Sequence, residues 1–74
     1  MRVNVFNEVI QATKHAEEKH PFFVETPAQA VSVATEELGE MAKAVNDGDW
    51  KQAKAEALDT IAVLVRFIYM FEEM

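Results

Sequence analysis

The chain of 74 residues contains no cysteine, and it has only two glycines, two prolines and two histidines. Without cysteine it can form no disulfide, cysteine-bound zinc site or thiol nucleophile, which fits a reducing compartment. A chain of this length buries only about 60% of its unfolded surface. Since disulfides cannot reinforce so small a core, we expect association with further copies to complete it.

Basic residues are also scarce, because 7 Lys and Arg residues stand against 13 Asp and Glu residues, for a formal net charge of −6. This balance argues against a nucleic-acid partner, which requires a basic surface. The N-terminal region lacks the pattern of a signal peptide. The apolar stretch of residues 61–71 is too short to span a bilayer and contains Arg66. We therefore expect a cytoplasmic protein with no membrane partner.

Hydrophobic periodicity predicts three helices, and hence an all-α fold. Apolar residues at spacings of three and four predict the first helix over residues 3–19 and the second over residues 28–45. The third is expected over residues 50–71. Because the turn between the second and third helices is short, these two should form an antiparallel hairpin. The whole chain, residues 1–74, is expected to be one domain.

Specific residues mark the helix ends. Thr26 is a typical N-cap, Pro27 suits the first helical position, and Gln29 completes a capping box. Gly48 can take the left-handed conformation that ends the second helix. Gly39 is unusual because a glycine within a helix costs about 1 kcal/mol relative to alanine. It indicates the close approach of another helix or of a ligand between the carboxylates, or it is merely tolerated there.

The third helix is apolar on nearly every side from residue 57 onward. A helix that is hydrophobic all round is a buried helix. One amphipathic hairpin and one short helix cannot cover all its faces. We therefore expect the cover to come from another subunit, in a homodimer or homotetramer.

Five acidic residues lie within the second and third helices: Glu36, Glu37, Glu40, Glu56 and Asp59. Residues three or four apart share a helix face, so Glu37 adjoins Glu40, and Glu56 adjoins Asp59. Both pairs lie in apolar stripes without matching Lys or Arg residues, where ionised groups are costly. The hairpin brings the pairs to similar heights. Four converging carboxylates would suit Mg²⁺ or Mn²⁺, which prefer oxygen ligands.

The pattern Glu36-Glu37-x-x-Glu40, followed after fifteen residues by Glu56-x-x-Asp59, resembles the motif of the MazG-like all-α nucleoside triphosphate pyrophosphohydrolases. The resemblance implies helical subunits that assemble around a four-helix-bundle core as a dimer or a dimer of dimers. It implies Mg²⁺ held by Glu37, Glu40, Glu56 and Asp59. Hydrolysis would occur between the α- and β-phosphates, with Glu36, Glu37 and Glu40 in catalytic positions and Glu36 as the candidate general base.

Four further residues are candidates for substrate binding. Lys43 is either a surface ion-pair partner or a ligand of a substrate phosphate. Trp50 either stacks on a base or packs. Arg66 and Tyr69 are the nearest candidates for the polar residue that the family often carries further along the third helix.

The connector between the first two helices carries the adjacent aromatic residues Phe22 and Phe23. They either close one end of the core or line a pocket for a planar base. His15 and His20 are interpreted as surface residues, because no second His or Cys lies at metal-ligand spacing from either.

The sequence thus favours a Mg²⁺-dependent pyrophosphohydrolase that converts (d)NTP into (d)NMP and pyrophosphate, in the removal of non-standard or surplus nucleotides. One alternative is a non-catalytic helical oligomerisation module whose acidic residues make contacts between subunits. Another is a phosphoribosyl-ATP pyrophosphohydrolase, from a related family with the same fold and part of the motif. The shortage of basic residues for an additional ribose phosphate argues mildly against it.

Overall fold

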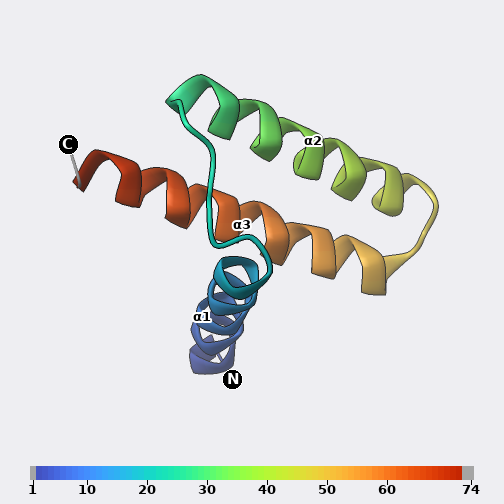
Figure 1. The fold of residues 1–74 in the computed structure, drawn as a ribbon. Coiled ribbons are helices and arrows are strands. Elements are labelled where there is room, and N and C mark those ends of the chain that lie inside the picture. The colour runs from blue at the N-terminus through green and yellow to red at the C-terminus, as the bar shows by residue number, and fades with distance from the viewer. Residues whose placement is uncertain (1, 73–74) are drawn as a thin grey trace.

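In the computed structural model, which describes residues 2–72, the chain folds into three helices joined by two connectors (Figure 1). They are α1 (Arg2–Lys19), α2 (Pro27–Asn46) and α3 (Trp50–Glu72). The described residues contain no strand, which confirms the predicted all-α fold, and the helix bounds differ from the predicted ones by at most one residue. None of the three described helices combines the length and the apolar character needed to cross a membrane.

The residues that the sequence predicts as helix caps form the capping contacts in the structure. The Thr26 hydroxyl accepts a hydrogen bond from the Gln29 backbone N–H at 3.2 Å, and Gln29 Oε1 accepts one from the Thr26 N–H at 3.0 Å, as in a capping box. Gly48, with φ of 72°, provides the left-handed residue after α2. Asp49 then caps α3, because its Oδ1 accepts a hydrogen bond from the Gln52 N–H at 3.1 Å.

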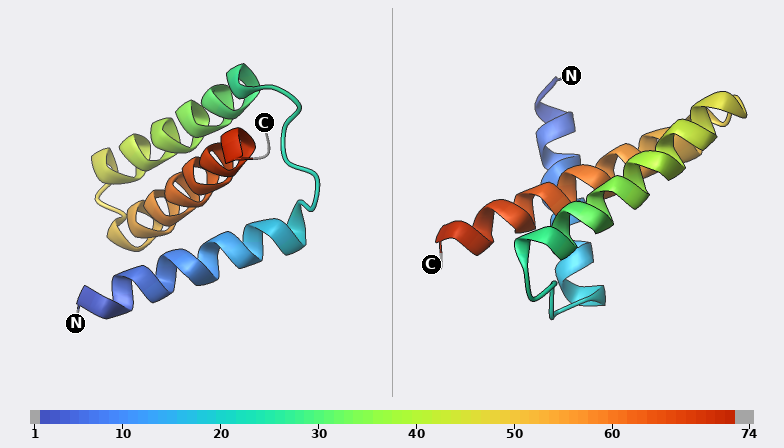
Figure 2. Two further views of the ribbon diagram at one scale, coloured as in Figure 1. Left: turned by 90° about the vertical axis from the view of Figure 1, so that its left-hand side faces the viewer. Right: turned by 90° about the horizontal axis from the view of Figure 1, so that it is seen from above.

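Helix α3 lies at the centre of the fold. It lies side by side with α2, while α1 crosses it on another side (Figures 1 and 2). Within residues 2–72, α1 packs on α3 and makes no close backbone approach to α2. An ion pair of 2.9 Å between Glu8 and Lys54 joins α1 to α3. Of the two other helices, only α3 therefore positions α1.

Arg66 on α3 fixes the C-terminal end of α1. Its side chain is only 9% exposed. It donates hydrogen bonds to two backbone carbonyl oxygens, to that of His20 at 2.7 Å and to that of Ala16 at 3.3 Å. Its guanidinium carbon also lies 4.7 Å from the centre of the Phe23 ring. Arg66 thus gives the His20 carbonyl a donor and adds a second donor to the Ala16 carbonyl, which already accepts from the His20 N–H at 2.8 Å, and it holds the following connector in place.

The hydrophobic core of the subunit is small. Among the described residues, the buried hydrophobic side chains are those of Ala30, Ala44 and Ala62. Larger apolar residues along α2 and α3 remain exposed, at 54% for Val31 and 44% for Leu64. Between these two helices they line an apolar groove of about 190 Å³. Within residues 2–72, the other two helices therefore leave much of α3 without cover.

Gly39 has free space around it. A Cβ atom added there would meet nothing within 4 Å. The close approach that the glycine indicates is therefore not made by another helix of the described subunit.

Candidate metal centre

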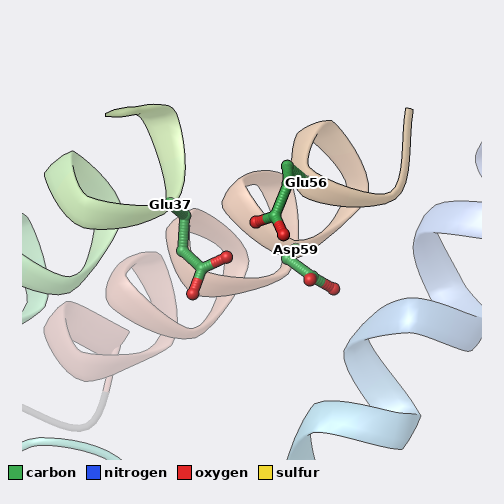
Figure 3. A group of neighbouring side chains, drawn as sticks. All are labelled: Glu37, Glu56 and Asp59. Carbon is green, nitrogen blue, oxygen red and sulfur yellow. The ribbon is translucent and has the colours of Figure 1, made fainter. Parts of the chain in front are cut away.

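Three carboxylate side chains converge between α2 and α3. Glu37 projects from α2 and Glu56 from α3 into the space between these helices, whereas the Asp59 side chain, also on α3, points away from Glu37 in this view (Figure 3). One oxygen of each lies within 4.8 Å of the others. The spacing of three residues on α3 and the packing of α2 along it account for this arrangement. We call these three residues the carboxylate cluster.

Glu56 is the buried member of the cluster, with 7% of its surface exposed. Its Oε1 accepts a hydrogen bond from Gln52 Nε2 at 2.7 Å. Its Oε2 is buried and has no hydrogen-bond partner among the described residues. A buried carboxylate oxygen without a donor is costly, so a bound cation would stabilise this atom.

The other two carboxyl groups have raised pKa values. Burial raises the pKa of Glu37 to about 7, and the adjacent carboxyl group of Glu56, with its charge, acts in the same direction. Burial is also the main cause that raises the pKa of Asp59, followed by the charge of Glu56, while His15 and Lys19 oppose the rise. Partial burial and the neighbouring negative charge therefore disfavour the ionised forms of Glu37 and Asp59.

Glu40 and Glu36 lie at the edge of the cluster. Glu40 is exposed, and its pKa is raised chiefly by its interaction with the adjacent Glu56 carboxyl group and next by the charge of Glu56. Glu36 is also exposed, and its charge adds to the rise in the pKa of Glu40. Of the four predicted metal ligands, the structure thus brings three into one group and places Glu40 beside the buried one.

Two of the predicted substrate-binding residues lie toward the turn between α2 and α3. Lys43 Nζ is 3.2 Å from Asp47 Oδ2, in an exposed ion pair. It also lines a pocket of about 260 Å³ that Glu40 and Glu56 share. Trp50 begins α3 with 68% of its surface exposed. It does not line this pocket.

The other two predicted residues, Arg66 and Tyr69, line a cavity of about 760 Å³ beside the α1–α2 connector. Phe22 and Phe23 also face this cavity, and no member of the carboxylate cluster lines it. Tyr69 is 49% exposed, whereas Arg66 is buried and bonded to backbone carbonyls. The larger cavity is therefore separate from the candidate metal centre.

A second cavity, of about 440 Å³, reaches the cluster, and we call it the cluster cavity. Glu37 and Asp59 line one part of it, and His15 and Lys19 of α1 line another. Its wall also includes Phe22, Phe23 and Arg66. The sequence predicts a surface position for His15 and does not single out Lys19. Their spacing of four residues places them on one helix face, but nothing in the sequence places that face beside Asp59.

Comparison with protein-family models, curated proteins and solved structures finds no match for this chain. The resemblance to the MazG-like family therefore rests on the acidic motif alone and stays a prediction.

Proposed function

We propose that this chain is a Mg²⁺-dependent nucleotide pyrophosphohydrolase that cleaves a (d)NTP into a (d)NMP and pyrophosphate. The observation that carries the proposal is the buried Glu56 Oε2, which has no hydrogen-bond partner within the described residues and belongs to a group of three carboxylates. An acidic cluster on a solvated surface would not keep such an atom out of water. A cation shared with Glu37 and Asp59 would satisfy it.

The donor set fits Mg²⁺ or Mn²⁺. All three side chains of the cluster offer carboxylate oxygens, and the group includes no histidine. Hard divalent cations prefer oxygen ligands, whereas zinc sites in proteins more often use Cys and His. Glu40 lies next to Glu56 and adds a fourth carboxylate at the edge of the cluster.

In the proposed reaction a water oxygen attacks the α-phosphorus, and the bond from that phosphorus to the bridging oxygen breaks as pyrophosphate leaves. Glu37, Glu56 and Asp59 would hold the metal, and Mg²⁺ bound there would neutralise the polyphosphate and lower the pKa of a water molecule. Glu36, exposed beside Glu40, is the proposed acceptor of the water proton. Phe22, with 90% of its surface exposed on the wall of the cluster cavity, offers a ring for stacking on a base.

The test is to incubate the protein with Mg²⁺ and a panel of nucleotides, including phosphoribosyl-ATP, and to measure released pyrophosphate. We expect Asp59→Asn to lower the rate by at least about a hundredfold, because it removes charge from the site of metal-centred stabilisation. Glu18→Gln, an exposed change on α1, is the matched control and should keep the rate of the parent. Near-normal turnover by Asp59→Asn would remove Asp59 from the site, and no release from any nucleotide would refute the proposed activity.

The proposal includes self-association. In it, the antiparallel α2–α3 hairpins of two copies would form a four-helix core, as a homodimer or as half of a homotetramer. The exposed Val31, Leu38 and Leu64 and the alanine-only buried core support this assembly. Light scattering at micromolar concentration should give the mass of at least two chains. A folded monomer at that concentration would contradict the assembly.

The same exposed apolar residues favour a second candidate function, a non-catalytic oligomerisation module. In that case the protein would assemble, but Mg²⁺ would cause no release of pyrophosphate and no stabilisation beyond that of matched ionic strength. The two candidates therefore differ in their response to the metal rather than in their mass in solution.

A further inference from the structure

The cluster cavity contains groups of opposite charge on opposing elements. Glu37 and Asp59 line it from α2 and α3, and His15 and Lys19 line it from α1. His15 and Lys19 are one helical turn apart and are both exposed. Both side chains thus share one cavity with the two carboxyl groups, and the Lys19 ammonium can attract an anion there.

Lys19 has no competing partner among the described side chains. Lys43 is paired with Asp47 and Lys54 with Glu8, but no such ion pair involves Lys19 within residues 4–72. Its ammonium group is therefore available to an anion in the cavity. The chain has a formal charge of −6, so an anion that enters the cavity is repelled by the surrounding negative charge. A cationic group such as Lys19 offsets that repulsion.

Arg66 is a less suitable anion ligand, although it lines the same cavity. Two of its nitrogens already donate to the carbonyls of Ala16 and His20, and its guanidinium lies over Phe23. These bonds have a further consequence for α1. The carbonyl oxygens at its C-terminal end would repel an anion near Lys19, and Arg66 offsets part of their negative charge.

We propose that Lys19, with His15 one turn before it, forms an anion-binding subsite that holds phosphate oxygens of the substrate across the cavity from the carboxylate cluster. The identification of this anion as a nucleotide polyphosphate rests on the proposed function. The metal-facing carboxylates would hold one part of the polyphosphate through Mg²⁺. Lys19 would hold another part directly, so the two ends of the cavity have different roles.

The test compares the parent with Lys19→Gln and with Lys14→Gln, an exposed control on α1 that does not line the cavity. Two quantities are measured in Mg²⁺: the KM and kcat for the best nucleotide of the panel, and the Kd of inorganic tripolyphosphate by calorimetry. Loss of one charged hydrogen bond should raise KM and Kd about tenfold in Lys19→Gln, while kcat changes much less. Lys14→Gln should match the parent, and Lys19→Arg should restore most of the affinity.

A structural role for Lys19 would give a different result, namely a lower melting temperature in EDTA with unchanged tripolyphosphate affinity. That result would overturn the subsite, as would an equal loss of affinity in Lys14→Gln, which would indicate a general effect of net charge. A parent without Mg²⁺-dependent hydrolysis would refute the proposed function. A tenfold difference in tripolyphosphate Kd between parent and Lys19→Gln would still support the anion subsite in that case.

Discussion

The substitution Glu37→Gln should stabilise the protein when no metal is present. In the parent, burial and Glu56 raise the pKa of Glu37 to about 7, so ionising Glu37 at alkaline pH opposes folding. A glutamine of nearly the same shape removes that charge. If Glu37 were instead an ordinary surface residue, its replacement would change stability little.

The expected magnitude follows from the raised pKa. The ordinary pKa of a glutamate is 4.5, so between about pH 4.5 and 7 the folded state binds more protons at Glu37 than the unfolded state, and stability falls as pH rises. A shift of this size sets a limit of about 3 kcal/mol. Because Glu37 is only partly buried, solvent screening should reduce the effect to about 1–2 kcal/mol. For a domain of this size, that is about 5–10 °C in melting temperature.

The assay is a set of thermal melts of parent, Glu37→Gln and the control Glu18→Gln, at one protein concentration and matched ionic strength. In EDTA, the variant should exceed the parent at about pH 8, and most of the difference should disappear at about pH 5, where Glu37 is protonated in the folded parent. In Mg²⁺ the difference in melting temperature between variant and parent should become smaller or change sign. A metal at 100 times its Kd stabilises the parent by about 2.7 kcal/mol, and the variant binds the metal more weakly because it has lost a ligand. A variant that is less stable than the parent in EDTA at pH 8 would refute the reasoning.

Two further substitutions test the fold. Arg66→Gln should lower the free energy of unfolding by about 2–4 kcal/mol, because it removes two hydrogen bonds to helix carbonyls and a cation–π contact, and α1 should become more accessible to proteases. Gly39→Ala should raise the free energy of unfolding by about 1 kcal/mol, because the added Cβ has free space and φ is not positive there. A loss of stability in Gly39→Ala, measured by chemical denaturation, would mean that another copy packs closely against Gly39.

The helices could be predicted because their signals are local. The capping box of Thr26 and Gln29 and the left-handed Gly48 each involve residues within a few positions of one another. The proximity of Glu56 and Asp59 in the acidic motif is also a local signal, because residues three apart on a helix are neighbours. Convergence with Glu37 required only one further step, the short turn between α2 and α3.

The position of α1 could not be predicted, because it depends on contacts between residues far apart in the sequence. Arg66 reaches the carbonyl of His20, 46 positions away. The sequence makes Arg66 a candidate for substrate binding, and the structure gives its guanidinium two backbone partners. The position of Lys19 on the cluster cavity could not be predicted for the same reason, since no pattern on α1 shows which face of that helix meets Asp59.

The small hydrophobic core and the negatively charged carboxylate cluster both lie between α2 and α3. Glu37 lies on α2, and Glu56 and Asp59 lie on α3, so the repulsion within the cluster acts directly between the two helices. Their buried hydrophobic contacts come from alanines, which contribute little apolar area to oppose that repulsion. In the proposed function, Mg²⁺ would link α2 to α3 at this point. Such a cross-link would stabilise a small domain that has no disulfides. Metal binding and the association of two copies should therefore be coupled, with Mg²⁺ lowering the concentration at which the dimer forms and EDTA raising it.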